Sequence, residues 1–249
     1  MVASRLAKRL LHFGLKTYGQ YYQLLNNGQH PHEFQLMINI LTTNETYFFR
    51  EPQHFDYVKD KILKHWRGDN FRLWSAASST GEEAYSLGML LTEQLGSRRW
   101  EIFGSDVNTD VLDVARNGVY LMNRLENMDK HYLDTYCLKG VRSQKGYFRV
   151  DEKIRNHVQF GQINLKADLS KNLGFFDVIF LRNVLIYFDK ETKQEILRRI
   201  IPMLKSGGHF FISHSETLHG LSVDLRMIKP SIYQKPRKLL NTRGFLGSR

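Results

Sequence analysis

The stretch Phe71-Arg72-Leu73-Trp74-Ser75-Ala76-Ala77-Ser78-Ser79-Thr80-Gly81-Glu82-Glu83 decides the fold. Its first six residues predict a strand, and the residues from Glu82 to Leu95 predict a helix, with a turn of small residues between them. Small side chains at such a turn let the backbone come close to a ligand. The turn has neither the G-x-G-x-x-G spacing of a dinucleotide site nor the lysine of a phosphate-binding loop, so both kinds of site are disfavoured.

The sequence leaves two interpretations of this turn open. A turn of small residues without a phosphate-binding lysine suits an uncharged nucleoside with an amino-acid tail, such as S-adenosylmethionine. The residues Thr80-x-x-Glu83 also have the pattern of a helix capping box, which satisfies backbone N–H groups and needs no ligand. The strands around the turn are needed to choose between the two.

The order strand, loop, helix recurs along the chain. The patterns predict strands at 101–105, 176–181 and 210–212, and helices through 111–115 and over 191–204, the last ended by 205–208. The run 176–181 is continuously apolar, as in a strand that is buried on both faces. The sequence therefore predicts an α/β fold with a Rossmann-like, doubly wound and mostly parallel sheet.

Two segments depart from this alternation. Residues 137–160 are polar and rich in turns, with β-prone pieces such as 147–150, and predict a small antiparallel β-subdomain inserted in the larger domain. Residues 4–41 carry apolar residues at helical spacing, broken at Asn26-Asn27-Gly28. We therefore expect a short all-α N-terminal domain over 1–41 and an α/β domain over 42–249.

Composition and charge narrow the class of protein. The 249 residues are 42% hydrophobic, but no apolar run is long enough to cross a membrane and no signal peptide is recognisable. A single cysteine excludes an internal disulfide, so we expect a cytoplasmic protein. The net charge is +11, and no acidic residue follows Asp224. Unless the basic C-terminal stretch is a solvated tail, this charge favours an acidic partner, either nucleic acid or an acidic protein surface.

Polar residues stand where the predicted strands end, which is where open α/β sheets bind their ligands. Asp106 follows the second strand, in a position from which a carboxylate can accept both hydroxyls of a ribose. Arg182, Asn183 and Tyr187 follow the buried strand 176–181, although Tyr187 could also be an aromatic side chain packed under a loop. The pair Asn164-Leu165 follows a short strand and could flank an adenine ring.

The segment Thr42-Thr43-Asn44-Glu45-Thr46-Tyr47-Phe48-Phe49-Arg50 precedes the first strand. It combines amide, hydroxyl and guanidinium groups with three consecutive aromatics, a mixture that is costly to bury unless a polar group docks there.

The chain lacks the sequence patterns of several other kinds of site. The histidines at 30, 32, 209 and 214 lack metal-ligand spacing, no proline precedes Cys137 as in a cytosine-methylating nucleophile, and no G-x-S-x-G elbow occurs. We therefore expect no metal.

In their order, these motifs resemble those of the CheR-type chemotaxis receptor methyltransferases. The resemblance covers 42–51, 75–85, Ser105-Asp106, Asn164-Leu165, 176–188 and Ile212-Ser213-His214-Ser215-Glu216, and so nearly the whole chain from residue 5. It implies a class I S-adenosylmethionine-dependent methyltransferase sheet with an inserted β-subdomain and a helical docking domain. Members of the family usually carry more helical sequence ahead of the opening motif, so we expect a shortened docking domain here.

The resemblance also implies the chemistry. The enzyme would transfer a methyl group from S-adenosylmethionine to glutamate carboxylates in the cytoplasmic methylation region of chemotaxis receptors, leaving S-adenosylhomocysteine. By motif position, the cofactor site would be lined by Asn44, Thr46, Arg50, Glu83, Asp106, Asn164, Leu165, Arg182 and Asn183, with Glu82 as an alternative to Glu83. Arg50 and Tyr187 would orient the incoming carboxylate or the sulfonium end of the cofactor.

The basic first helix would then dock the acidic receptor through Arg5, Lys8 and Arg9. We expect a monomer that neither binds nucleic acid nor inserts into a membrane. Two alternatives remain on the sequence: an RNA or DNA methyltransferase, which the charge would suit, and a non-catalytic S-adenosylmethionine-sensing scaffold. Against the first, the chain has no Asp/Asn-Pro-Pro-Tyr/Phe motif for methylating an amino group.

Overall fold

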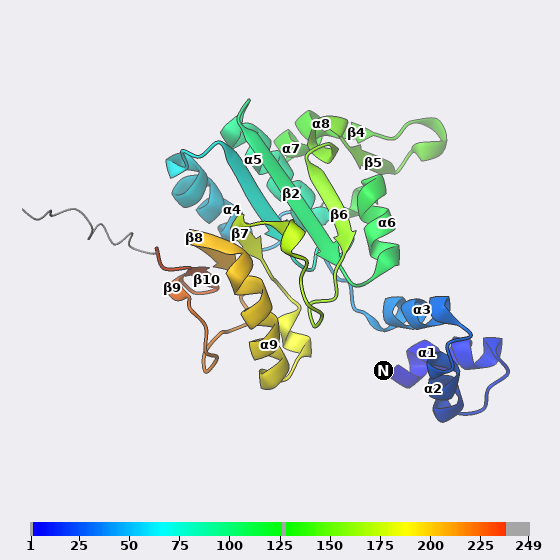
Figure 1. Cartoon of the computed structure of the whole chain (residues 1–249). Coiled ribbons are helices and arrows are strands. Elements are labelled where there is room, and N and C mark those ends of the chain that lie inside the picture. Colours follow the sequence, from blue (N-terminus) through cyan, green and yellow to red (C-terminus); the bar gives the residue numbers. More distant parts are fainter. Residues whose placement is uncertain (1, 126–127, 238–249) are drawn as a thin grey trace, which may run out of the picture.

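A seven-stranded sheet forms the centre of the structure, a computed structural model that describes residues 2–125 and 128–237. The strand order is β6-β2-β1-β7-β8-β10-β9 (Figure 1). The strands are β1 (Asn70–Ser75), β2 (Arg99–Asp106), β6 (Val158–Gln162), β7 (Phe176–Phe180), β8 (Leu204–Phe211), β9 (Arg226–Lys229) and β10 (Ile232–Gln234). The pairs from β6 to β8 are parallel, and β10 and β9 are antiparallel. The predicted mostly parallel α/β sheet is confirmed.

Helices cover both faces of this sheet because its central strands are apolar on both sides. Successive side chains of a strand point to opposite faces. In β1, Phe71 and Leu73 join one core, whereas Trp74 joins the other. The helices of this domain are α4 (Pro52–Tyr57), which continues through a π-helical turn (Val58–Ile62), α5 (Glu82–Leu95), α6 (Thr109–Asn117) and α9 (Lys190–Ile200). Residues of α4 and α5 pack in the first core and residues of α9 in the second.

The small antiparallel sheet begins earlier in the chain than predicted. Its order is β3-β5-β4, with β3 (Val119–Leu121), β4 (Cys137–Lys139) and β5 (Tyr147–Val150), flanked by α7 (Lys130–Tyr136) and α8 (Glu152–Arg155). Three residues are too few for β3 to show an alternating pattern, and its partner β5 is distant in sequence. The strand β6 begins inside the predicted insertion 137–160 but pairs with β2 of the large sheet. The small sheet therefore occupies 119–150.

Helix α9 ends at Ile200 rather than at residue 204. Pro202 has no backbone N–H, and its ring clashes with the carbonyl of the preceding turn, so the helix tightens into a 3₁₀ turn over Ile201–Met203. The segment 205–208, predicted to end the helix, lies within β8. The chain therefore enters its last parallel strand directly from the proline turn.

The described part of the basic C-terminal stretch is not a solvated tail. It forms the hairpin of β9 and β10, which the sequence did not predict. Lys235 anchors its end, because its Nζ donates to the carbonyl oxygens of Ile201 (2.9 Å) and Leu204 (2.7 Å). The basic residues from 238 onward lie outside the described residues.

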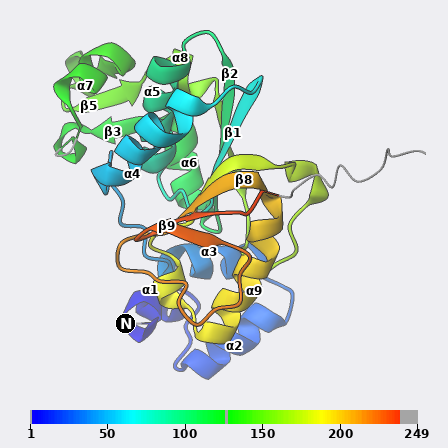
Figure 2. The same cartoon turned by 90° about the vertical axis from the view of Figure 1, so that its left-hand side faces the viewer.

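Three helices at the N-terminus form a separate lobe, called the helical lobe below: α1 (Val2–His12), α2 (Tyr18–Asn26) and α3 (Pro31–Leu41). Leu6, Leu10 and Tyr21 form its buried apolar cluster. A capping box between Thr17 and Gln20 begins α2. The helical lobe lies near the carboxyl ends of the parallel strands, and the small sheet lies at the opposite end of the molecule (Figures 1 and 2). Within the described residues, no helix is both long and apolar enough to cross a membrane.

Candidate active site

A cavity of about 740 Å³ opens where β1, β2 and β7 end. The register brings these ends level, because Ser75 pairs with Gly104 of β2 on one side and with Phe180 of β7 on the other. This is the switch point of the sheet, where open α/β folds bind ligands. The cavity is lined by all the residues predicted for cofactor and chemistry: Asn44, Thr46, Arg50, Glu83, Asp106, Asn164, Leu165, Arg182, Asn183 and Tyr187.

Backbone groups hold the carboxylate of Asp106 at the end of β2. Its Oδ2 accepts a hydrogen bond from the N–H of Ser79 (3.0 Å), and its Oδ1 accepts one from the N–H of Asn108 (3.0 Å). Ser79 has a φ of 49°, a left-handed conformation that turns its N–H toward the carboxylate. Burial raises the pKa of Asp106, although these N–H groups oppose the shift. The result is a fixed acceptor on the cavity wall.

Arg182 lies at the floor of the cavity with its side chain only 2% exposed. Its guanidinium pairs with Glu83 Oε2 (3.1 Å) and Glu51 Oε2 (3.2 Å) and donates to the carbonyl oxygen of Arg50 (2.7 Å). Two carboxylates therefore share one buried cation. Burial raises the pKa of Glu83, while Arg182 and a hydrogen bond from Ser75 (2.6 Å) oppose that rise.

The structure separates the adjacent acids Glu82 and Glu83. Glu83 lines the cavity, whereas Glu82 is fully buried on the other side, where it accepts from Thr80 (2.6 Å) and pairs with Arg124 (2.9 Å). The capping box considered for this turn does not form: Gly81, with a φ of 95°, is the N-cap of α5 and makes no side-chain cap. The small-residue turn is therefore free to face the cavity.

The segment 42–50 runs along the cavity and joins the helical lobe to the sheet; it is called the joint below. The carbonyl oxygen of Asn44 accepts from the hydroxyl of Ser79 (3.0 Å). Arg50 donates to the carbonyl oxygen of Glu45 (2.9 Å), and its guanidinium lies 5.4 Å from the ring centroid of Tyr47. The buried rings of Phe48 and Phe49 pack in the core beneath the joint. The polar residues Asn44, Thr46 and Arg50 of the joint thus line the cavity, whereas its buried aromatic rings pack in the core.

The loop after β7 carries Asn183 and Tyr187, and sequence analysis missed the residue that shapes it. Glu216 accepts hydrogen bonds at 2.8–3.1 Å from four backbone N–H groups, those of Ser213, Asn183, Val184 and Leu185. Asn183 adopts a φ of 57° there, and Tyr187 is left 57% exposed at the cavity. Glu216 ends the motif Ile212-Ser213-His214-Ser215-Glu216, but a cradle of N–H groups supplied by two loops has no sequence signal.

The residues after β6 form another wall. Asn164 turns the chain, because its Oδ1 accepts from the N–H of Lys166 (2.9 Å). Leu165 packs against the second core and faces the cavity. This apolar wall lies in the same cavity as Asp106, as expected if a ring and a ribose bind side by side.

Of the three predicted docking residues, two have partners within the chain. Arg9 forms a two-point ion pair with Glu33 (2.8 and 2.6 Å), and Arg5 donates to the carbonyl oxygens of Leu41 (2.7 Å) and Thr42 (3.1 Å). Arg5 also lines the cavity. Lys8 is exposed. A helical pattern shows which face is basic but not that α3 supplies an acid to it. Arg9 is held by that acid within the lobe, and its docking role stays a prediction.

These features define the class of Rossmann-like methyltransferases that use S-adenosylmethionine. Residues 44–233 match the family described as CheR methyltransferase, SAM binding domain, and residues 1–42 match its all-alpha domain. The chemotaxis protein methyltransferase of Escherichia coli K12 is 43% identical over 235 residues, 94% of this chain and 82% of that protein. Chemotaxis protein methyltransferase 2 of Pseudomonas aeruginosa PAO1 is 43% identical over 237 residues, 94% of this chain and 84% of that protein. The chain belongs to the CheR methyltransferase family.

Proposed function

We propose that this chain methylates glutamate carboxylates in the cytoplasmic methylation region of chemotaxis receptors, with S-adenosylmethionine bound in the cavity at the strand ends. The observation that carries this proposal is that one cavity is lined by every residue that the motifs assign to cofactor and to chemistry. Membership of the CheR family supports the same activity. It disfavours the alternatives of a nucleic-acid methyltransferase and a non-catalytic scaffold.

The chain's own groups fit this cofactor. Asp106 offers a carboxylate whose outer lone pairs can accept the two ribose hydroxyls while its inner ones are held by backbone N–H groups. Leu165 offers an apolar surface to the adenine ring, and Glu83 offers a carboxylate to the amino-acid end. When bound, S-adenosylmethionine supplies a methyl group activated by its sulfonium charge.

Methyl transfer to a carboxylate requires no proton transfer by the enzyme before the attack. A glutamate carboxylate is already ionised near neutral pH, so the chain needs no strong general base and contributes mainly by placing the reactants. Arg50 and Tyr187 border the cavity and offer a guanidinium and a hydroxyl to orient the incoming carboxylate. The single cysteine takes no part: burial raises the pKa of Cys137 to about 12, and it lies in β4 of the small sheet.

The wider setting follows from the same proposal. On the same proposal, the chain acts as a monomer in the cytoplasm, where the methylation region of the receptor lies. The products are a methyl ester on the receptor and S-adenosylhomocysteine. Lys8 on α1 and the charge of +11 favour an acidic receptor surface.

Labelled S-adenosylmethionine tests this function directly. The full chain is incubated with methyl-labelled cofactor and, in parallel, with cytoplasmic receptor fragments, RNA or DNA. We expect label on the receptor fragment alone, released by mild base as methanol because a methyl ester is base-labile. A receptor fragment with its acceptor glutamates changed to alanine is the matched control. Base-stable label, or label on nucleic acid, would contradict the proposal.

A further inference from the structure

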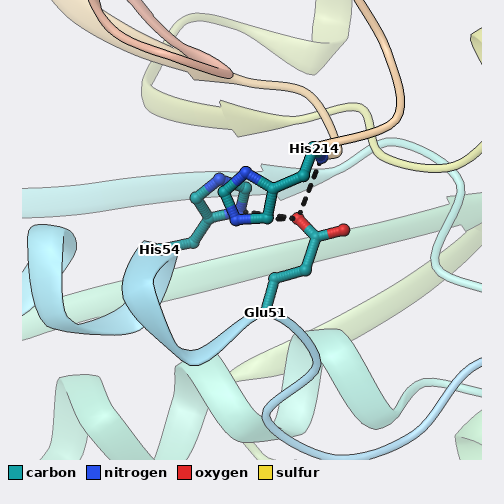
Figure 3. A group of neighbouring side chains, drawn as sticks. All are labelled: Glu51, His54 and His214. Atoms are coloured by element: carbon teal, nitrogen blue, oxygen red, sulfur yellow. Dashed lines mark hydrogen bonds and ion pairs between the residues drawn. The ribbon is translucent and has the colours of Figure 1, made fainter.

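Two histidines and a glutamate gather behind the floor of the cofactor cavity. Glu51 precedes α4, His54 lies on α4, and His214 lies in the loop after β8, with their polar ends together in Figure 3. Glu51 Oε2 lies 3.4 Å from His54 Nδ1 and 3.8 Å from His214 Nε2, and all three ligand atoms lie within 4.8 Å of one another. Both histidines line a second cavity of about 400 Å³. The group is therefore reachable from outside the cofactor site.

We assign the protons of the two rings from the contacts of Ser231. Its hydroxyl donates to the carbonyl oxygen of Pro230 (2.6 Å), so toward the rings its oxygen can only accept. It accepts from His54 Nε2 (2.7 Å) and His214 Nδ1 (3.3 Å). The remaining nitrogens, His54 Nδ1 and His214 Nε2, then carry lone pairs, and both lie beside Glu51 Oε2.

In this assignment the two ring nitrogens present lone pairs to Glu51 Oε2, which, among the residues that the structure describes, accepts a hydrogen bond only from the backbone N–H of His214 (3.3 Å) and pairs with Arg182 (3.2 Å). His54 is fully buried, and its Nδ1 has no hydrogen-bond partner within 2–125 and 128–237. A buried acceptor without a donor is costly. Arg182 does not cancel the local charge, because Glu51 and Glu83 share it.

We propose that Glu51, His54 and His214 bind one divalent transition-metal ion of the Zn²⁺ type. Two imidazoles and one carboxylate are a known ligand set for Zn²⁺, with an open fourth position. Ligand atoms at zinc bond lengths in a tetrahedral site stand about 3.3 Å apart, close to the 3.4 and 3.8 Å found around Glu51 Oε2. The exposed His214 side chain can rotate to close the remaining gap.

The surroundings suit such an ion. A histidine that binds a metal usually donates its other N–H to a fixed acceptor, and Ser231 provides that acceptor to both rings. The ligands come from two segments that are far apart in the sequence, Glu51 and His54 at the start of α4 and His214 in the loop after β8, so the ion would fasten these two segments together. A ligand that binds only the folded chain raises its melting temperature. Zn²⁺ should therefore stabilise the protein.

Metal binding by the full, tag-free chain tests the site. Zn²⁺ is titrated in competition with a chromophoric chelator, and Co²⁺ is used as a spectroscopic probe of nitrogen and oxygen ligands. We expect one Zn²⁺ per chain for the unmodified protein and at least about tenfold weaker binding for His214→Ala. His219→Ala is the matched control, because it removes another exposed histidine of the same loop. With ten histidines in the chain, this control separates the site from surface binding.

A second variant distinguishes the loss of a metal ligand from the loss of the fold. Glu51→Gln keeps the side-chain shape and removes the charged ligand, and circular dichroism reports whether the fold is retained. Added Zn²⁺ should raise the melting temperature of the unmodified chain and of His219→Ala, but not that of His214→Ala or Glu51→Gln. Stoichiometric binding that is equally strong in His214→Ala and His219→Ala would overturn the proposal, and so would the absence of Zn²⁺ binding at micromolar concentration.

Discussion

The active-site edge of the sheet and the helical lobe use their charged residues in opposite ways. At the sheet edge, Asp106, Glu83 and Arg182 lie over a large core on both faces of the sheet, and their polar atoms border a cavity. In the helical lobe, Arg9 and Glu33 hold the helices together over three buried apolar side chains. A large core can bear charges placed for a ligand, whereas a small lobe depends on its charges for its own stability.

Removing the carboxylate of Glu216 should have the largest effect, because four backbone N–H groups lose one acceptor. For Glu216→Ala we expect the free energy of unfolding to fall by about 4 kcal/mol. The methyl-transfer rate should fall by more than about 100-fold, since Asn183 and Tyr187 lose their placement. Urea unfolding and single-turnover kinetics measure both, with the exposed Glu191→Ala on α9 as the control. Equal behaviour of the two variants would show that the cradle is not what orders this loop.

Removing the acid of the helical lobe tests the other side of the comparison. Glu33→Ala leaves Arg9 and the hydroxyl of Tyr21 (2.6 Å from Glu33) without their partner in a buried setting, which we expect to cost about 3 kcal/mol. Amide hydrogen exchange should speed up in α1–α3 and remain slow in the sheet. Asp113→Ala, which breaks an exposed pair with Arg116 on α6, should change neither region. Equal loss of protection in both regions would mean that the lobe and the sheet unfold as one unit.

Removing the ribose acceptor should weaken cofactor binding, and it should also lower stability, because the N–H groups of Ser79 and Asn108 lose their acceptor. Asp106→Ala should weaken S-adenosylmethionine binding by about 100-fold, or about 2.7 kcal/mol, because two hydroxyl hydrogen bonds to a carboxylate are lost. Isothermal titration calorimetry measures the affinity, and Asp113→Ala on the exposed face of α6 is the control. Unchanged affinity in Asp106→Ala would refute the ribose assignment.

Lowering the pH should destabilise the helical lobe before it destabilises the sheet. Burial alone would raise the pKa of Glu33, but hydrogen bonds from Arg9 and Tyr21 outweigh it and lower that pKa. Because the folded pKa lies below the unfolded value of about 4.3, Glu33 stabilises the lobe above that pH, and the stabilisation is lost as the pH falls through the folded pKa. Burial raises the pKa of Glu83 and Asp106, so their protonation removes no stabilisation.

Tryptophan fluorescence makes this acid experiment selective, because all three tryptophans lie outside the helical lobe. Between about pH 5 and pH 3, amide exchange in α1–α3 should speed up before the fluorescence changes. Glu33→Gln should abolish this difference in pH dependence. A fluorescence change that precedes the loss of protection in α1–α3 would reverse the comparison.

Changes in salt concentration and in surface charge should have the smallest effect, and the quantity they change is the methylation rate. If an acidic receptor docks on the lobe, raising the ionic strength from about 0.05 M to about 0.5 M should lower the methylation rate on receptor fragments, because screening weakens such steering. Lys8→Glu should lower the rate at low salt several-fold, whereas Lys64→Glu, the same charge change after α4, should not. A rate that is independent of salt would leave the lobe without a docking role.

Much of the fold could be predicted, because its signals are local. The helix from Glu82 to Leu95 has the predicted bounds, and β7 was visible as an apolar run. The apolar pattern of the last helix predicts an end at residue 204, whereas Pro202 ends the helix earlier, at Ile200. The strand β3 and the hairpin of β9 and β10 were missed, since short strands gain their stability from partners rather than from their own pattern.

The sequence by itself determined the alternation that builds the sheet, the polar residues at the strand ends and the family to which the chain belongs. These rest on short-range pattern and on motifs in a fixed order. Only the tertiary structure decided that Glu83 rather than Glu82 faces the cavity, that Arg9 is held by Glu33, and that Glu216 shapes the loop of Tyr187. It also brought His54 to His214, which lie in different segments. The physical reason is that ion pairs and N–H cradles join residues far apart in sequence, and no local pattern records which partner the fold will supply.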